Sequence, residues 1–308
     1  MRALACPASL KGVLRASAAA AALGEGLRSA GAEVVELPVA DGGEGTASVL
    51  QRARGGRWHD AGVPDAFGRE RRARWLELPD GTAVVESAEA IPLDPSRRDP
   101  MHASSRGLGE LIAAVGRPER LLVTLGGTAN VDGGAGLLEV VSELPAPTRV
   151  ACDSLVPLLD AARFYAQQKG ASPEQVEELA AQLAGRTDLA PYAELPGAGA
   201  AGGLGAALAS LGAELVPGAA LVLDEIGFDP RGFDLVVTGE GQVDRTTATG
   251  KAPGEVARRC RGADICCVVF GGRIVEPLPG VETRELSGDP TRAHEDLVAL
   301  GDELAQPK

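Results

Sequence analysis

The sequence predicts an α/β protein with two lobes: a mainly parallel, Rossmann-like domain and a second α/β domain that contains a mixed sheet. Short apolar runs of strand length recur along the 308 residues, and helical stretches lie between many of them. This alternation is typical of parallel sheets whose strands are connected by helices. Residues 57–89 break the rhythm, because they form short strands interrupted by polar residues, with Asp80-Gly81 as a hairpin turn.

The expected elements follow from the apolar pattern. Strands are predicted at residues 3–6, 34–39, 83–85, 121–125, 150–152, 235–237 and 265–270. Helices are predicted at residues 17–29, 108–115, 136–141, 175–183, 199–211 and 253–261. Ser172-Pro173-Glu174-Gln175 is a strong helix start, with an N-cap serine, proline at N1 and glutamine at N3.

The irregular region also suggests how the chain divides. We expect residues 1–55 and about 235–308 to form the Rossmann-like domain, and residues from about 56 to 234 to form an inserted second domain. No low-complexity linker and no internal repeat is visible.

Composition and charge exclude several classes of partner. The net charge of −13 repels nucleic-acid backbones and anionic membranes, and the aromatic content of 3% disfavours base stacking. The N-terminal apolar run ends at Pro7 and is too short for a signal peptide. Five cysteines without zinc-type spacing indicate reduced thiols and a cytoplasmic protein. A homodimer is compatible with these observations.

Polar, glycine-rich segments follow several of the apolar runs. The longest is residues 238–253, TGEGQVDRTTATGKAP, and a helix is expected to begin at Ala252-Pro253. Others are residues 41–46, 126–134 and 152–153. Ligands of open α/β sheets bind at the carboxyl ends of strands, where such loops gather. Neither a Walker loop nor a GxGxxG motif is present, so a nucleotide site would belong to a less common class.

The ordered set of motifs resembles the bacterial glycerate kinases that begin with an APDSFKG-like segment. The resemblance covers residues 1 to about 272, and residues 273–308 match poorly. Its six motifs are CPASLKG at 6–12, VADGGEGT at 39–46, the LGG segment at 122–136, CD…QKGA at 152–171, PGAGAAGGLGAAL at 196–208 and TGEG…GKAP at 238–253.

This resemblance implies ATP-dependent phosphorylation of a hydroxyl of D-glycerate to 2- or 3-phosphoglycerate, with Mg²⁺. Both reactants are anions, so cations must gather locally, and a carboxylate must accept the hydroxyl proton. The implied catalytic residues are Lys11, Asp153 and Asp244. The implied glycerate-binding residues are Ser9, Lys11, Arg69, Glu86 and Asn130. The implied nucleotide-binding residues are Gly126, Gly127, Thr128, Gly202, Gly203 and Lys251, and the implied metal ligands are Asp41 and Glu44.

Simpler structural roles are open for several of these residues. Glu86 could pair with an arginine of the hairpin region, and Asp132 could cap the helix that follows it. Asp153 could form an Asx turn. Lys169-Gly170 could simply end a helix, which is a common use of lysine followed by glycine.

Some positions depart from the family pattern. Ala8 stands where aspartate is usual, and Val131, Leu155 and Gln242 also replace the usual residues. Lost hydrogen-bonding groups could change the substrate without changing the fold. A non-catalytic or altered-substrate paralogue that binds a related hydroxy acid or nucleotide is therefore the main alternative. A dinucleotide-dependent dehydrogenase is a further one, and the missing glycine fingerprint argues against it.

Overall fold

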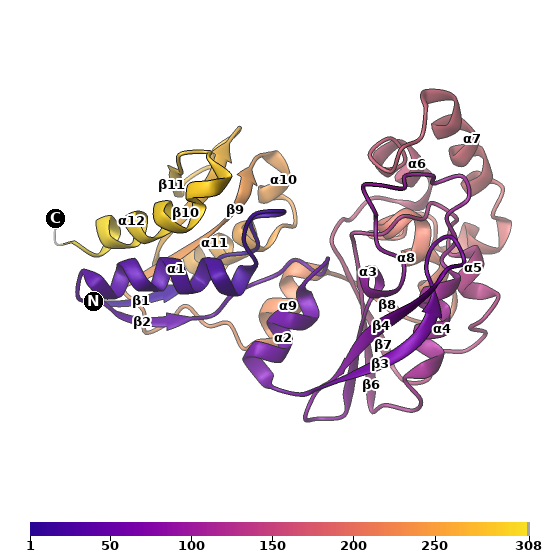
Figure 1. Cartoon of the computed structure of the whole chain (residues 1–308), viewed down its shortest axis with the longest axis horizontal. Helices are drawn as coiled ribbons and strands as arrows, with labels where there is room; N and C mark the ends of the chain where they lie inside the picture. The colour runs from indigo at the N-terminus through magenta and orange to yellow at the C-terminus, as the bar shows by residue number, and fades with distance from the viewer. Residues whose placement is uncertain (307–308) are drawn as a thin grey trace. The chain divides into compact units, whose positions relative to one another are not determined.

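The computed structural model describes residues 1–306, which divide into two compact units (Figure 1). The first unit combines residues 1–41 with the chain from Val222 onward, and the second is Gly42–Leu221. Helix α2 (Thr46–Arg54) therefore counts with the second unit, and residues 222–234 count with the first. The α/β fold class is confirmed, with one parallel and one mixed sheet.

The first unit contains a five-stranded sheet in which every pair of neighbouring strands is parallel. Its strands, in spatial order, are β11 (Glu282–Glu285), β10 (Cys266–Ile274), β9 (Leu235–Val243), β1 (Arg2–Ala5) and β2 (Glu33–Glu36). Because β1 pairs with both β9 and β2, the centre of this sheet joins the two ends of the chain.

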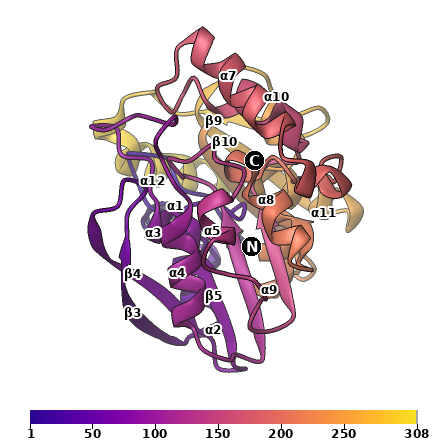
Figure 2. The same ribbon diagram turned by 90° about the vertical axis from the view of Figure 1, so that its right-hand side faces the viewer.

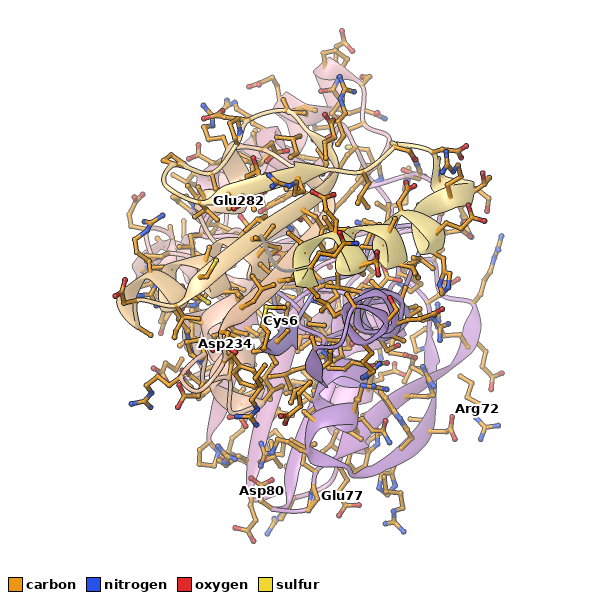
Figure 3. All side chains as sticks on the ribbon, turned by 90° about the vertical axis from the view of Figure 1, so that its left-hand side faces the viewer. Cys6, Arg72, Glu77, Asp80, Asp234 and Glu282 are labelled. Carbon is orange, nitrogen blue, oxygen red and sulfur yellow. The ribbon has the colours of Figure 1, made fainter. Side chains whose placement is uncertain are left out.

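Helices cover both faces of this sheet. On one face α1 (Ala16–Ser29) and α12 (Ala293–Ala305) lie side by side, as Figure 3 shows, and they share a core with Phe270 of β10. The two helices approach closely because a side chain on Gly26 would collide with the backbone of α12. On the other face α11 (Ala252–Gly262) packs against β9 and β10.

The second unit contains a six-stranded mixed sheet. Strand β4 (Glu70–Glu77) is antiparallel to both of its neighbours, β3 (Arg57–Pro64) and β5 (Thr82–Glu86). The four strands from β5 to β8 (Glu214–Pro217) run parallel. The Asp80-Gly81 turn connects β4 to β5, as the sequence predicted. The strands in spatial order are β3 (Arg57–Pro64), β4 (Glu70–Glu77), β5 (Thr82–Glu86), β6 (Arg120–Leu125), β7 (Thr148–Cys152) and β8 (Glu214–Pro217).

Two hydrophobic clusters organise the helices of this unit, whose ribbons are labelled in Figure 2. In the larger cluster α4 (Arg106–Ala114) and α8 (Ala200–Ser210) contribute the leucines that pack on the sheet. In the smaller cluster α6 (Ala161–Tyr165) packs on α7 (Pro173–Ala184), whose predicted capping box between Ser172 and Gln175 is confirmed. The remaining helices are α3 (Ser87–Ala90), α5 (Ala135–Leu138), η1 (Leu158–Asp160), η2 (Thr187–Tyr192), α9 (Gly218–Glu225), α10 (Arg245–Ala248) and η3 (Pro290–Arg292).

The segment 238–253 is more regular than its composition suggests. Strand β9 continues to Val243, because β10 extends alongside it and pairs Ile274 with Val243. Gly239 belongs to this strand, and a Cβ there would lie 2.5 Å from the Phe270 ring. The glycine therefore makes room for packing, and the predicted loop is shortened by tertiary pairing. The predicted helix start at Ala252 is confirmed.

Candidate active site

A cavity of about 820 Å³ lies in the first unit at the carboxyl end of its sheet. Its walls come from the segments that follow β1, β9, β10 and β11 and from the start of α12. Four of the predicted site residues line it, namely Ser9, Lys11, Asp244 and Lys251. This location is where ligands bind in open parallel sheets.

Lys251 forms an ion pair with Asp41 inside the first unit. Its Nζ lies 2.7 Å from Asp41 Oδ2, and both side chains are partly buried. Burial strengthens this charge pair relative to an exposed one. Lys251 was predicted to bind the nucleotide and Asp41 to bind the metal. Their pairing limits how Lys251 can contact a nucleotide and how Asp41 can contact a metal.

Glu240 is a site residue that the sequence reasoning missed. It lines the same cavity, and its Oε1 accepts a hydrogen bond of 2.8 Å from Thr247 Oγ1. Burial raises the pKa of Glu240 to about 7, with Asp41 and Asp244 acting in the same direction and Lys251 opposing them. A carboxyl group that titrates near neutrality in a cavity is a candidate for proton transfer. Its position directly after the apolar part of β9 was the signal that could have identified it.

Asp244 begins α10 as its N-cap. Its Oδ1 accepts hydrogen bonds from the amide and the hydroxyl of Thr246, at 2.8 and 2.6 Å, and its Oδ2 accepts one from Gln242 Nε2 at 2.8 Å. These bonds from Thr246 and Gln242 lower the pKa of Asp244. Gln242, which departs from the family pattern, and Thr246 therefore both stabilise the charged form of Asp244, which makes it a weaker base.

In the second unit, the ends of the parallel strands bring a separate group of predicted residues together. A Cβ on Gly126 would lie 2.6 Å from Asp153 Oδ2, so glycine is required for the carboxylate to approach. Gly127 has a φ of 67°, and Glu44 lies next to it. Gly126 and Asp153 follow the adjacent strands β6 and β7, which explains why they meet.

The backbone of residues 126–130, which we call the GGTAN loop, has an uneven hydrogen-bond pattern. Its carbonyls are held, since Gly127 O accepts a bond of 2.7 Å from the Leu93 amide and Asn130 O accepts one of 2.7 Å from Lys169 Nζ. Within residues 1–306 no acceptor is found for the amides of Gly127 and Thr128. Successive unpaired amides in a glycine-rich turn are suited to binding an anion.

Glu86 has a helix-capping position rather than the expected arginine partner. Its Oε1 and Oε2 accept hydrogen bonds from the amides of Gly45 and Ala47, at 2.6 and 3.0 Å, at the start of α2. Burial raises the pKa of Glu86 to about 7, although the two amides lower it. The hairpin arginine Arg74 pairs instead with Glu89. Glu86 thus fixes the segment that carries Glu44.

Asn130 and the two glycines of α8 pack closely together, and among the described residues the buried Asn130 Oδ1 has no hydrogen-bond partner. Asn130 is buried and donates to Asp132 Oδ1 at 2.9 Å and to Ala201 O at 3.2 Å. Gly202 and Gly203 have φ values of 74° and 95° and pack against the backbone of residues 130–133. This close backbone packing explains why both positions are occupied by glycine. Asp132 also accepts from the amides at the start of α5, which is the capping role considered for it.

Three further residues have positions that the sequence did not indicate. Arg69 is exposed in the turn between β3 and β4. Val131 is buried in the cluster around α6 and α7, so its apolar character serves packing. Leu155 is 41% exposed, and nothing in the structure explains its replacement of the usual residue.

The carboxylates of the first unit could bind a Mg²⁺ ion whose other ligands come mainly from the nucleotide and water. Within residues 1–306 no group of three or more His, Cys, Asp or Glu side chains could by itself hold an ion. Mg²⁺ in kinases needs only one or two protein carboxylates, because nucleotide phosphates and water complete its coordination. Asp41 and Glu240, which face the same ammonium of Lys251, could supply such oxygens.

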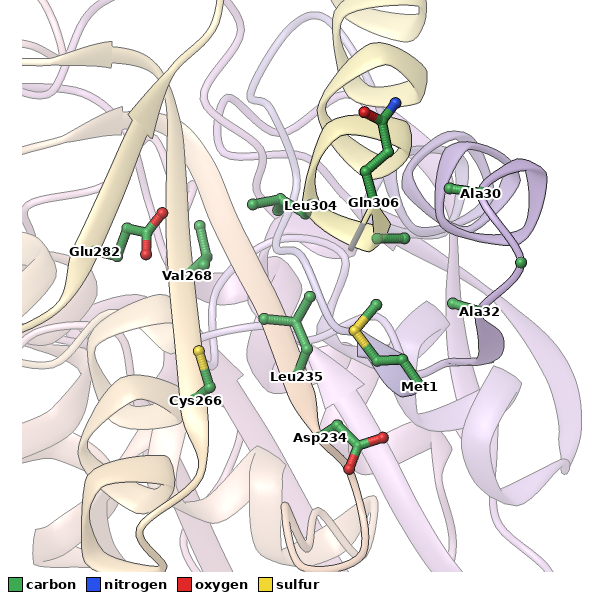
Figure 4. A pocket seen from close by; sticks show the side chains of 12 residues that line it. Met1, Ala30, Ala32, Asp234, Leu235, Cys266, Val268, Glu282, Leu304 and Gln306 are labelled. Carbon is green, nitrogen blue, oxygen red and sulfur yellow. The ribbon is translucent and has the colours of Figure 1, made fainter. Parts of the chain in front are cut away.

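A second cavity, of about 490 Å³, lies at the amino ends of the strands in the first unit (Figure 4). Met1, Leu235 and Cys266 line it, together with the carboxylates Asp234 and Glu282. No lysine or arginine is among its described lining residues. The charged side chains of this cavity are therefore carboxylates, which disfavour an anionic substrate.

Comparison with known proteins agrees with this chemistry. The model of the glycerate kinase family matches residues 3–143 and 141–288. Glycerate kinase of Bacillus subtilis (strain 168) is 35% identical over 328 residues, covering 89% of this chain and 85% of that protein. Glycerate 2-kinase of Escherichia coli (strain K12) is also 35% identical, over 309 residues that cover 83% and 81% of the two chains. A crystal structure from Salmonella typhimurium LT2, assigned as a glycerate kinase 2, superposes with a TM-score of 0.80 at 29% identity and covers 99% of this chain and 97% of that one.

These relatives show that the chain is a kinase, a phosphotransferase that acts on a hydroxyl group. The chain belongs to the glycerate kinase family. The family assignment suggested by the six motifs is therefore confirmed. None of the helices in residues 1–306 combines the length and apolar character that a membrane-spanning segment needs.

Proposed function

We propose that the protein transfers a phosphoryl group from ATP to the 2-hydroxyl of D-glycerate, yielding 2-phosphoglycerate. The acceptor follows from the glycerate kinases that share up to 35% of its sequence. The position of transfer is supported by the relative that is a glycerate 2-kinase. A dinucleotide-dependent dehydrogenase finds no support among these relatives.

The observation that carries the proposal is the GGTAN loop. The amides of Gly127 and Thr128 have no acceptor within residues 1–306 and lie at the carboxyl end of β6, which supports their use as donors to a nucleotide phosphate. Backbone donors do not require a large positive charge, and this matters in a chain whose net charge is −13. We therefore assign the nucleotide phosphates to Gly126, Gly127 and Thr128, and we do not extend this site to Gly202 and Gly203.

We assign the proton transfer to Asp153. Its carboxylate lies directly against Gly126, next to the amides that would hold the transferred phosphate. A carboxylate at that place can accept the proton of the attacking hydroxyl. Asp244 is less suited to this role, because the bonds that cap α10 lower its pKa.

The cavity of the first unit contains cations of its own. Lys11 and Lys251 can neutralise a carboxylate or a phosphate, and Ser9 can hydrogen-bond a hydroxyl. Mg²⁺, when bound, neutralises charge that develops on the phosphates. In the first unit Asp41 and Glu240 are the candidate ligands, and in the second unit the candidate is Glu44, which lies beside Gly127.

The decisive experiment incubates the purified protein with ATP, MgCl₂ and D-glycerate and follows ADP release. We expect turnover that depends on D-glycerate, and ³¹P NMR of the product should show the 2-phosphate. A product signal of 3-phosphoglycerate would correct the position of transfer. ATP binding without turnover would instead support the non-catalytic paralogue.

A variant links this activity to the assigned residue. Asp153→Asn removes the charge and changes the volume little, so kcat should fall by at least ~10² while the melting temperature stays close to that of the wild type. Full activity of the folded variant would remove Asp153 from the mechanism. Asp188→Asn is a matched control, because that carboxylate pairs with Arg186 near η2 and lies outside the GGTAN loop.

A further inference from the structure

Lys169 is a buried charged residue to which the mechanism above gives no role. The residue is 3% exposed, and its ammonium group bonds to the protein itself. Its backbone ends a helical turn, and Gly170 follows with a φ of 103°. A Cβ on Gly170 would lie 2.6 Å from Arg98 Cβ, which explains the glycine. This helix-ending role accounts for the backbone but not for the position of the ammonium group.

The ammonium group of Lys169 lies under the GGTAN loop. Nζ donates to Asn130 O at 2.7 Å and to Thr128 Oγ1 at 3.4 Å, so its two bonds lie on either side of Ala129. The Tyr165 ring of α6 lies beneath it, with its centroid 5.7 Å from Nζ. Ala129 itself is held by a bond of 3.1 Å from its amide to Ile91 O.

Burying this ammonium is unfavourable for folding. Among the residues that the structure describes, no carboxylate forms an ion pair with Lys169. Asp153 and Asp132 favour the charged form from a distance, but burial outweighs them and lowers the pKa of Lys169 to about 8. A methionine of similar length would fill the space without a desolvation penalty. Packing alone therefore does not account for a lysine here.

We propose that Lys169 is a positioning residue that holds the GGTAN loop in the arrangement that leaves the amides of Gly127 and Thr128 open to a phosphate. The proposal rests on the function proposed above. Carbonyls that bond to Lys169 and to the Leu93 amide cannot turn toward the ligand, so the loop presents donors on its free side. An anion site of this kind depends on preorganised amides rather than on a lysine that touches the ligand.

The first test compares Lys169→Met with the wild type. Methionine keeps the length and removes both hydrogen bonds, so the KM for ATP should rise by at least ~10-fold, the change expected for ~1.4 kcal/mol of lost binding. The KM for D-glycerate and kcat should change much less. Leu179→Ala is the matched control, because it destabilises the neighbouring cluster of α6 and α7 without touching the loop. It should lower the melting temperature and leave the KM for ATP unchanged.

A second measurement needs no activity. Hydrogen exchange of the Ala129 and Leu93 amides, which bond to Ile91 O and Gly127 O in the ligand-free protein, should be faster in Lys169→Met than in the wild type, and unchanged in Leu179→Ala. Faster exchange together with the higher KM for ATP supports the proposal. Unchanged exchange, or an unchanged KM in the folded variant, overturns it. A wild type that shows no turnover with ATP and D-glycerate refutes the proposed function, while the exchange comparison still decides whether Lys169 holds the loop.

The charge can be tested separately with Lys169→Arg, which stays protonated at every accessible pH. In the wild type the affinity for ATP should decline above about pH 8, as Lys169 loses its proton. The charged and titratable groups around it are Asp132, Asp153, Tyr165 and, beside Gly170, Arg98. The decline should be absent in the arginine variant. An identical decline in both proteins would assign it to one of these neighbours and overturn the requirement for charge.

Discussion

At the scale of single residues, two carboxylates four positions apart acquire opposite properties. Glu240 is buried against few donors and has a raised pKa, whereas Asp244 receives three hydrogen bonds and has a lowered one. Both line the same cavity. Carboxylates whose environments separate their pKa values commonly take different parts in a reaction.

This difference predicts how activity depends on pH. The carboxylate form of Glu240, which is the form that could hold Mg²⁺, increases as the pH rises through about 7, so kcat/KM should rise over the same interval. Glu240→Gln should lower kcat/KM by ~10² and remove this rise. The measurement is the pH profile of initial rates from pH 5.5 to 8.5.

Asp244→Asn is the matched control for Glu240→Gln. It makes the same change of charge in the same cavity, and asparagine is a good N-cap, so the start of α10 should be preserved. We expect a smaller loss of activity and an unchanged pH profile. A larger loss in Asp244→Asn than in Glu240→Gln would assign the catalytic part to Asp244, as the motif comparison first implied.

At the scale of elements, Glu86 ties the end of β5 to the start of α2. The folded-state pKa of about 7 lies above the ordinary value of 4.5, so the native protein retains this proton over that interval. The contribution of Glu86 to the free energy of unfolding should therefore fall as the pH rises from about 4.5 through 7, by on the order of 3 kcal/mol.

Glu86→Gln tests this dependence. Glutamine cannot ionise, so the difference in unfolding free energy between wild type and variant should change between pH 5 and pH 8 by that amount. Urea unfolding at both values provides the measurement. Glu89→Gln serves as the control for the loss of a nearby carboxylate, since Glu89 is paired with Arg74 and not with the amides at the start of α2.

The strands show which parts of the fold could be predicted from the sequence. Buried parallel strands have continuous apolar runs, and the β1, β6 and β7 predictions are therefore confirmed to within two residues. Strand β11 reads Glu-Thr-Arg-Glu and was missed, because an edge strand defined by pairing with β10 needs no apolar run. Residues 238–243 were predicted to form a loop for the converse reason, as their glycines pack within a strand.

The candidate site, like the fold, was predicted from the sequence only in part. The strand-end rule placed Gly126 and Asp153 correctly beside each other, because it depends only on strand order. The roles of Glu86 and Glu240 depend on which backbone amides and hydroxyls happen to lie within hydrogen-bond distance. Such contacts join residues distant in sequence, and no local pattern records them.

At the scale of the whole molecule, the second unit is continuous in sequence and the first is not. Gly42–Leu221 contains all six strands of its sheet and two hydrophobic clusters of its own. We expect a protein fragment of these residues to fold without the rest of the chain. Cooperative urea unfolding and protected amides in β5, β6 and β7 would demonstrate this.

The opposite result is equally informative. A fragment that stays unfolded while the full chain folds would mean that the second unit depends on residues outside its own cores. Residues 1–41 expressed alone are the control. They should remain unfolded, because β1 and β2 lack the partner strand β9 and the helix α12 that complete their core.

The position of β1 between β2 and β9 also constrains synthesis in the cell. The ribosome releases β1 first, and β9 emerges only after the complete second unit has been made. During that time the apolar edge of β1 is unpaired while the unit inserted behind it can already fold. The N-terminal strand must therefore be shielded or remain unstructured until the last third of the chain arrives. Slowing translation after Leu221 would lengthen the interval in which this protein is most prone to aggregate.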